Sequence, residues 1–402
     1  MLAHLVDTIP ELNPNLEPPL VLGTAELATR AYHGQSLEQL LALIGTPENP
    51  AARHFDQGLA HQLWFARETG LAHQQQALKH SSLYRIRETP TGRPTIKLLA
   101  FMAPGDLMVN TPLDFLTAHL DIRLDLLYLL PNQPLPAAIP DHDVAICAVS
   151  DSDRETLHRV AALQRTWPRP ILNDPRKILP FARDWLVNTL RGIPNLHCAE
   201  TIQTTRAQLT AGPPIQNLLP NSRYPILLRP LASHGGQGLA KIDTQADNAA
   251  FLNTTEGNDF YLTQFINYRS RDGWFRKYRV AFIDQKPFLC HMAISEHWMI
   301  HYLNAGMTES AAKRNEEAQA MASFETTFAT RHAAAFEALN KVIGLDFFSI
   351  DCGETRDGAL LIFEADVAAI IHLMDPPEMF PYKRAAMQKC FDAFGAMVTA
   401  TA

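Results

Sequence analysis

The chain has 402 residues, a length that predicts two or three domains. Hydrophobic residues make up 47% and charged residues 19%, a composition typical of a soluble globular protein. Its formal net charge of −7 argues against a broad nucleic-acid-binding surface, and its five scattered cysteines, without CxxC spacing, argue against a structural zinc site and fit a reducing cytoplasm. No apolar run approaches the roughly 18 residues of a membrane span, and the N-terminus lacks the basic and apolar regions of a signal peptide.

The first part of the chain has apolar residues at helical spacing. The pattern runs from Thr24 to Leu78 and is interrupted by the Pro-Glu-Asn-Pro segment at 47–50. We therefore predict a helical N-terminal module over residues 1–93 that packs against the next domain. Oligomerisation or a role as a lid is the alternative.

Strands alternate with helices in the next part, residues 94–172. Strands are predicted at 95–103, 124–130, 143–149 and 170–172, and helices at 112–120 and 151–166. This alternation is typical of a parallel, doubly wound α/β unit. The loop at Gly105, which follows the first strand, is either a ligand-binding turn or a plain connection.

A glycine-rich loop follows a strand in the third part, residues 173–402. The segment 224–242, YPILLRPLASHGGQGLAKI, places the loop Ser233-His234-Gly235-Gly236-Gln237-Gly238 between two strands, without the GK[ST] ending of a Walker A motif. Glycines allow backbone N–H groups to approach an anion, and Arg229 adds side-chain donors at the end of the first strand. The alternative is an ordinary flexible hairpin.

A basic strand and an acidic hairpin come later. In the predicted strand 276–283, Lys277 and Arg279 share one face and are either solvated or in contact with a ligand. In the hairpin 347–366, with Asp357 and Gly358 as the central turn residues, Asp351 lies directly opposite Glu364.

Asp366 lies on the same face of this hairpin as Asp351 and Glu364, because side chains alternate along a strand. Three carboxylates on one face repel one another, so we predict that a cation binds there. Mg²⁺ or Mn²⁺ is expected, because these ions prefer oxygen ligands. A solvated hairpin without a ligand is the alternative. Helices are also predicted at 176–190, 310–342 and 381–397.

In this order, the glycine-loop hairpin, the QFI strand, the basic YRV strand and the ID and EAD carboxylates resemble the ATP-grasp superfamily. The resemblance covers about Ile171 to Phe394 and is strongest to its RimK-like and glutathione-synthetase-like carboxylate–amine ligases. It implies a two-subdomain ATP-grasp domain over 173–402, preceded by a Rossmann-like pre-ATP-grasp domain over 94–172.

The resemblance also implies roles for individual residues. Asp351, Glu364 and Asp366 match metal ligands, and Arg279 matches the arginine that meets phosphate or acyl-phosphate oxygens. Arg229 stands where an ATP-contacting lysine is usual, so Arg229 and Arg279 are the implied catalytic residues. The implied ATP-binding residues are Arg229, Ser233, His234, Gly235, Gly236, Gln237 and Gly238, together with Gln264, Phe265 and Ile266, whose backbone reads adenine.

This chain departs from the family pattern at two places. Trp185 replaces a second usual lysine, with Arg183 and Lys177 nearby, and the sequence VAAIIH after Asp366 replaces an NxxPG-like turn. The segment from His291 to Met307 lies where family members bind the acceptor substrate. Its polar residues are either substrate contacts or structural groups: His291, Glu296, His297, His301 and Asn304.

The implied function is an ATP- and Mg²⁺-dependent ligase that joins a carboxylate to an amine through an acyl phosphate. Its substrates would be small molecules or peptides. We expect a cytoplasmic protein without nucleic-acid or membrane partners, with homo-oligomerisation left open. The alternatives are a nucleotide-binding regulatory or scaffold protein without turnover, and a kinase of the same fold.

Overall fold

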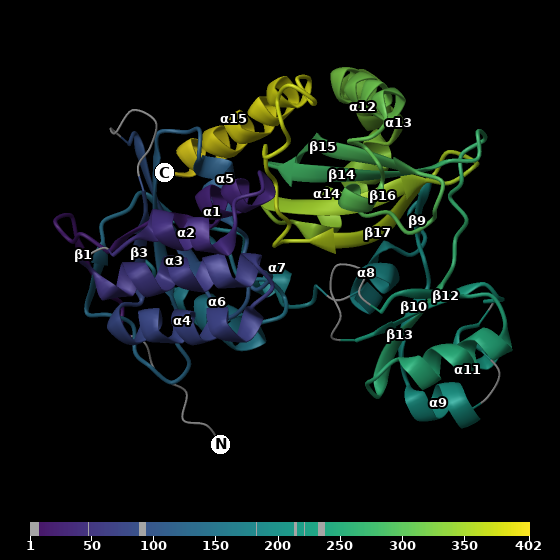
Figure 1. The fold of residues 1–402 in the computed structure, drawn as a ribbon, viewed down its shortest axis with the longest axis horizontal. Coiled ribbons are helices and arrows are strands. Elements are labelled where there is room, and N and C mark those ends of the chain that lie inside the picture. Colours follow the sequence, from purple (N-terminus) through teal and green to yellow (C-terminus); the bar gives the residue numbers. More distant parts are fainter. Residues whose placement is uncertain are drawn as a thin grey trace.

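The computed structural model describes residues 8–46, 48–87, 94–181, 183–212, 215–220, 222–231 and 238–402. The described residues form three larger sheets and one two-stranded sheet, with helices between and around them (Figure 1). The predicted α/β class is confirmed. The two-stranded sheet joins β1 (Glu11–Asn13) to β6 (Ala138–Pro140) in parallel.

The N-terminal half is built on a six-stranded sheet in the order β2-β3-β5-β4-β7-β8. Strands β4, β5, β7 and β8 are parallel, as predicted, and their residues are mostly buried because helices cover both faces. The strands and the two connecting helices are β2 (Leu20–Val21), β3 (Leu83–Ile86), β4 (Ile96–Met102), α5 (Leu113–Thr117), β5 (Ile122–Tyr128), β7 (Val144–Cys147), α6 (Arg154–Leu163) and β8 (Ile171–Leu172).

The segment 1–93 contributes both strands and helices to this half. Strands β2 and β3 join the same sheet as 94–172, so the segment is not wholly helical, and the division at residue 93 stays a prediction. Its helices are α1 (Gly23–Tyr32), α2 (Leu37–Ile44), α3 (Pro50–Leu63) and α4 (Arg67–His80). Helices α3 and α4 approach closely, since a Cβ on Gly70 would lie 2.7 Å from the Gly58 carbonyl oxygen.

Two buried carboxylates accept hydrogen bonds from the N-terminal turn of α1. Asp56 accepts from the backbone N–H of Leu22 at 2.9 Å and of Gly23 at 3.2 Å, and Asp114 accepts from that of Ala25 at 2.7 Å. Burial raises the pKa of both Asp56 and Asp114 to about 6, although these hydrogen bonds oppose the shift. The carboxylates satisfy otherwise unpaired helix N–H groups at an electrostatic cost.

This arrangement predicts a specific pH dependence of stability. Because the pKa of Asp56 is raised in the folded state, its contribution is fully present below about pH 4 and is lost as the pH rises through about 6. A shift of this size corresponds to about 2–3 kcal/mol. The unfolding free energy of the parent should therefore fall relative to that of Asp56→Asn as the pH rises. Urea unfolding of both proteins from pH 4 to pH 8 measures this change. A difference independent of pH would contradict this.

The C-terminal half contains two sheets. The four-stranded sheet has the order β10-β13-β11-β12 and the five-stranded sheet the order β15-β14-β16-β17-β9. Helix α8 contacts strands of both sheets, and in Figure 1 it lies between them. The strands are β9 (Leu196–Cys198), β10 (Thr201–Thr205), β11 (Ile226–Pro230), β12 (Ala240–Ile242), β13 (Asp259–Gln264), β14 (Phe275–Ile283), β15 (Lys286–Ser295), β16 (Phe347–Glu354) and β17 (Leu360–Asp366).

Two predicted helices of this half are interrupted. The predicted helix 176–190 is divided into α7 (Pro175–Ile178) and α8 (Arg183–Leu190), and 310–342 into shorter pieces. The second break has a local cause, because the Thr326 and Thr327 hydroxyls donate to the Ser323 carbonyl and compete with the helix. The remaining helices are α9 (Arg206–Ala211), α10 (Ile215–Leu218), α11 (Gln245–Thr254), η1 (Tyr302–Asn304), α12 (Ala311–Ser323), η2 (Phe324–Thr326), α13 (Phe328–Arg331), α14 (Ala333–Ile343) and α15 (Lys383–Thr401).

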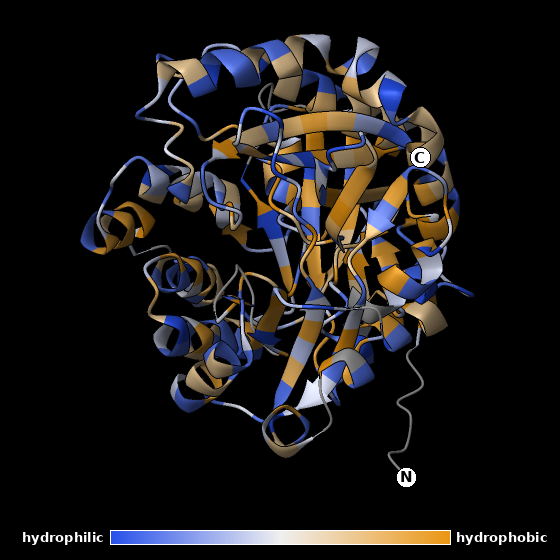
Figure 2. Ribbon diagram, turned by 90° about the vertical axis from the view of Figure 1, so that its right-hand side faces the viewer, coloured by the Kyte–Doolittle hydropathy of each residue, from blue (hydrophilic) through white to orange (hydrophobic). Residues whose placement is uncertain are grey.

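Apolar residues concentrate in the strands, and many outer helix faces are hydrophilic (Figure 2). One large core follows the five-stranded sheet and continues into the six-stranded sheet, so the two halves share packing. A second core lies between the six-stranded sheet, the helices of the N-terminal segment and α15. Among the described helices, none combines the length and apolar character needed to cross a membrane.

Candidate functional site

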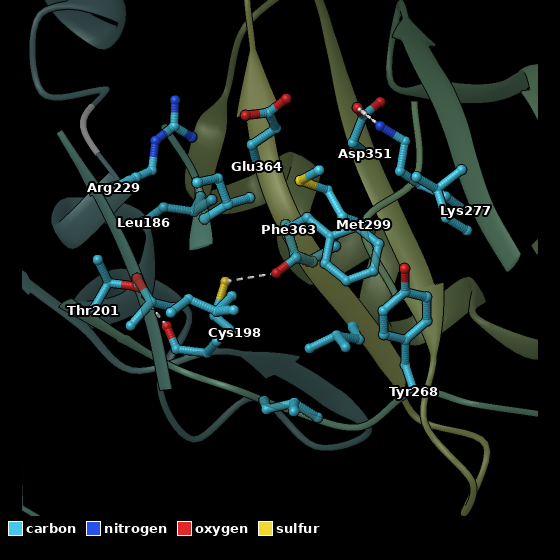
Figure 3. Close-up of a pocket in the computed structure, with 18 of the residues that line it drawn as sticks. Leu186, Cys198, Thr201, Arg229, Tyr268, Lys277, Met299, Asp351, Phe363 and Glu364 are labelled. Atoms are coloured by element: carbon cyan, nitrogen blue, oxygen red, sulfur yellow. Dashed lines mark hydrogen bonds and ion pairs between the residues drawn. The ribbon is translucent and has the colours of Figure 1, made fainter. Parts of the chain in front are cut away.

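A cavity of about 380 Å³ lies between the four-stranded and the five-stranded sheets. Its walls come from α8, from strands β9, β10, β11, β13, β14, β16 and β17, from the loop of Met108, and from the segments that follow β13, β15 and β17. A cavity of this volume is within the range of small-molecule sites. One end is mainly apolar and the other carries charged side chains (Figure 3).

The apolar end is formed by side chains that are distant in sequence. Leu186 and Val187 of α8 and Ile362 and Phe363 of β17 line this end. Cys198 of β9 lines it too, with its thiol 3.8 Å from the carbonyl oxygen of Ile362, its partner on the neighbouring strand. Burial raises the pKa of Cys198 to about 12, so the thiol stays protonated and acts as a small apolar group. This end suits a flat apolar group such as a nucleobase.

The segment whose backbone is predicted to contact adenine also lines the cavity. Gln264, Phe265 and Ile266 all contribute to the wall, but the strand ends at Gln264, so Phe265 and Ile266 follow it. The Gln264 N–H donates to the Glu200 carbonyl at 2.9 Å. The Phe265 ring packs edge-on against Trp298, with 5.7 Å between ring centroids.

The charged end collects the residues whose roles the resemblance implies. Arg229, Arg279, Asp351, Glu364 and Asp366 all line the cavity. In Figure 3, Arg229 and Glu364 extend toward the same end, with Asp351 and Lys277 beside them. The structure thus brings together side chains of β11, β14, β16 and β17. Strands β14, β16 and β17 are antiparallel neighbours in one sheet.

The predicted pairing of Asp351 with Glu364 is confirmed, although the turn differs from the prediction. Thr355 and Ala359 close a three-residue turn in which Gly358 has φ +86°, so positions near the turn are shifted by one. A bulge between Asp351 and Cys352 restores the predicted register. The two one-residue shifts compensate, and Asp351, Glu364 and Asp366 share one face.

Asp351 is paired with two cationic side chains of the neighbouring strand β14. Arg279 donates to both of its carboxylate oxygens, at 2.8 and 3.0 Å, and Lys277 donates at 2.8 Å. Burial alone would raise the pKa of Asp351, but Arg279 and Lys277 hold that pKa well below its usual range. Lys277 and Arg279, for which a solvated position was an alternative, are therefore largely buried partners of Asp351.

Asp366 has a different environment. Its carboxyl is partly buried beside Glu364, and burial together with that like charge raises its pKa to about 6, although the Ala368 N–H donates a 2.7 Å hydrogen bond to it. A nearby cation would stabilise the charged forms of both carboxylates.

No group of three His, Cys, Asp or Glu side chains in the described part of the chain is placed to hold a metal ion. Glu364 and Asp366 nevertheless fit Mg²⁺, which is commonly held by one or two carboxylates plus substrate phosphates. Asp351 does not fit in this conformation, because both of its oxygens are engaged by Arg279 and Lys277. The metal roles of these residues stay predictions.

Several other predicted residues lie in and around the cavity. Gly238 is described, with φ +67°, and a Cβ at this position would lie 2.8 Å from the Pro230 Cδ, whereas Ser233 to Gln237 lie outside the described residues. Trp185 packs against Phe181 with 5.5 Å between ring centroids and does not line the cavity. Lys177 donates to the Gly344 carbonyl. The side chain of Arg183 is also outside the described part.

The five candidate acceptor contacts separate into groups. His301 lines the cavity, and its backbone N–H donates to the Asn304 side chain at 2.9 Å. His291 pairs with Arg279 across β14 and β15 and lies 4.8 Å from the Tyr302 ring, between centroids. Glu296 and His297 are exposed and outside the cavity wall.

Sequence reasoning missed most of the apolar wall. Leu186, Val187, Cys198 and Met299 have no local pattern that distinguishes them from core residues. Met108 also lines the cavity, and the proposed ligand-binding turn at Gly105 was the one sequence signal near it.

No family model matches the chain, and no curated protein matches it. Solved structures that align with it include an ATP-grasp RimK domain protein of Sphaerobacter thermophilus, at 16% identity over 76% of this chain and 99% of that one, with a TM-score of 0.41. A D-alanine–D-alanine ligase of Bacillus anthracis aligns at 12% identity over 76% and 98%, with a TM-score of 0.44. The VanG D-Ala:D-Ser ligase of Enterococcus faecalis aligns at 13% identity over 75% and 99%, also with a TM-score of 0.44. These solved structures include ATP-grasp proteins, the superfamily that the sequence resembles, and at these TM-scores no conclusion about activity rests on them.

Proposed function

We propose that this protein is an ATP-grasp ligase that joins a carboxylate to an amine, with release of ADP and phosphate. The observation that carries the proposal is the two-ended cavity between the two C-terminal sheets. Its apolar end suits the base, and its charged end presents Arg229, Lys277 and Arg279 together with Glu364 and Asp366. Cations opposite a carboxylate pair suit phosphate groups with a bound divalent cation.

The reaction transfers the γ-phosphoryl group of ATP to the substrate carboxylate, which breaks the bond to the β-phosphate oxygen and releases ADP. The amine then attacks the acyl carbon, phosphate leaves with the bonding electrons, and the amine loses a proton to solvent. Arg229 and Arg279 stabilise the negative charge on the transferred group, and the apolar walls exclude water. When bound, Mg²⁺ supplies further neutralisation of phosphate charge beside Glu364 and Asp366.

One observation favours the alternative of a nucleotide-binding protein without turnover. Arg279 and Lys277 engage both oxygens of Asp351, so the three predicted carboxylates do not act together as metal ligands in this structure. A screen of amino acids and small carboxylates for ADP release separates the functions. Release that requires both a carboxylate and an amine supports the ligase, release with a phosphorylated acceptor alone indicates a kinase, and nucleotide binding without release indicates a scaffold.

MgATP should stabilise the folded protein. A ligand bound by the native state alone adds about 2.7 kcal/mol to the unfolding free energy at a hundredfold excess over Kd. We expect the melting temperature to rise with MgATP concentration, as measured by calorimetry. An unchanged melting curve at millimolar MgATP would show that the cavity does not bind the nucleotide.

Variants of Arg229 test whether stabilisation by MgATP depends on the charged end of the cavity. Arg229→Ala should reduce the stabilisation by MgATP, while Arg229→Lys should keep part of it because the positive charge survives without the planar fork. Lys177→Ala is the matched control, since Lys177 donates to the Gly344 carbonyl outside the cavity. If MgATP stabilises Arg229→Ala and the parent equally, Arg229 has only a structural role in β11.

A further inference from the structure

The turn between α3 and α4 exposes two aromatic side chains, Trp64 and Phe65. Phe65 is 95% exposed and Trp64 is 40% exposed, and no other phenylalanine or tryptophan in the described ranges is classed as exposed. Exposed aromatic side chains are costly in water and are frequent at binding surfaces.

Phe65 has a left-handed backbone conformation, which is unusual for a phenylalanine. Phe65 has φ +59°, and it ends α3 in a Schellman arrangement, with its N–H donating to the Gln62 carbonyl at 3.0 Å and the Ala66 N–H to the His61 carbonyl at 2.9 Å. Glycine is the usual residue at this position because it adopts the left-handed conformation without strain. Phe65 is strained and almost fully exposed, so neither helix capping nor core packing accounts for a phenylalanine here.

Contacts on both sides of this turn lead toward residues that line the cavity. Leu63 and Ile370 pack against the same small apolar cluster, and Ile370 lines the cavity. Arg67 donates to the Asp106 carboxylate at 3.1 and 3.2 Å, and the same carboxylate accepts from the Met108 N–H at 3.1 Å.

Met108 is 41% exposed and also lines the cavity. It therefore belongs both to the cavity wall and to the exposed apolar surface next to the turn. The Arg67–Asp106 ion pair therefore holds the turn of Trp64 and Phe65 next to the loop that carries Met108.

We propose that Trp64, Phe65 and Met108 form an apolar lip that binds an apolar side chain of a peptide substrate while its reacting group occupies the charged end. This inference rests on the proposed function and specifies its substrate class. A free amino acid or small acid is contained within the cavity and does not reach the lip, whereas a peptide extends beyond it. The continuity of the lip with the cavity through Met108 favours the substrate over a second copy of the chain as its occupant.

The test uses two matched tetrapeptides, Ala-Phe-Glu-Ala and Ala-Ser-Glu-Ala, each with free ends. Their binding to the full chain is measured by calorimetry with Mg²⁺ and a non-hydrolysable ATP analogue. We expect the parent to bind the phenylalanine peptide at least about tenfold more tightly, the discrimination that burial of one apolar group provides. Phe65→Gly should remove most of this preference and leave binding of the serine peptide unchanged.

Phe65→Gly should also raise the melting temperature, because glycine relieves the left-handed strain. Substitution of a residue with only a structural role would not raise the melting temperature and at the same time remove the preference for the phenylalanine peptide. Leu43→Ser is the control, since Leu43 is an exposed apolar residue of α2 that does not line the cavity, and it should leave the preference intact.

Equal binding of the two peptides to the parent, or no binding of either, would overturn the proposal, as would a preference that survives in Phe65→Gly. A parent dimer that dissociates in Phe65→Gly, seen by sedimentation, would assign the lip to self-association and also overturn it. ADP release is measured in parallel. A retained peptide preference without ADP release contradicts the ligase function and supports the lip, whereas ADP release without a preference contradicts the lip alone.

Discussion

Glu364→Gln should abolish ATP turnover without destabilising the metal-free protein. The side chain keeps an oxygen for hydrogen bonds and loses its charge, which removes repulsion with Asp351 on β16 and with Asp366 on the same strand. The expected gain is about 0.2–1 kcal/mol, as for a cross-strand charge pair. Turnover should fall by more than about a hundredfold, because the phosphate charge is no longer balanced by a cation held at Glu364. Unfolding in chelator and ADP release with MgATP measure the two effects.

Glu354→Gln is the matched control on β16. Glu354 accepts hydrogen bonds from Arg331 and His332, both at 2.8 Å, and lies outside the cavity. This variant should lose stability and retain turnover, the reverse of Glu364→Gln. If Glu364→Gln instead melts several degrees lower in chelator and stays active, the interpretation of the hairpin as a metal site is wrong.

Arg279→Met should lower both stability and activity. It leaves the buried Asp351 carboxylate with Lys277 as its one remaining partner among the contacts described above, and loss of a partner from a buried ion pair costs about 3 kcal/mol. Since the lowered pKa of Asp351 stabilises the parent above about pH 4, the stability deficit of the variant should shrink as the pH falls below that value. Turnover should fall by about a hundredfold or more, because Arg279 also faces the proposed phosphate site. Urea unfolding and ADP release measure these effects.

A second substitution separates the two roles of Arg279. Adding Asp351→Asn to Arg279→Met removes the buried charge and should recover part of the stability but none of the turnover. Arg276→Met is the control on β14, because Arg276 pairs with Asp272 and Glu316 away from the cavity. It should retain turnover. Recovery of activity in the double variant would mean that Arg279 serves only to neutralise Asp351.

Features that depend on local sequence patterns could be predicted from the residues alone. Alternating apolar runs around Gly358 gave the β16–β17 hairpin, and side-chain alternation placed Asp351, Glu364 and Asp366 on one face. The parallel strands β4, β5 and β7 followed from apolar runs separated by helical segments. These features arise from residues that are close in the chain.

Contacts between distant segments could not be predicted in this way, because they depend on how the sheets pack. Whether Arg279 and Lys277 face solvent or Asp351 depends on the register of β14 against β16, and their ion pairs join residues 72 and 74 positions apart. The apolar wall combines α8, β9 and β17, and its leucines and valines resemble core residues until the sheets are placed. The exposure of Phe65 likewise depends on where the α3–α4 turn lies, because a local pattern of hydrophobicity does not specify which surface an apolar side chain meets.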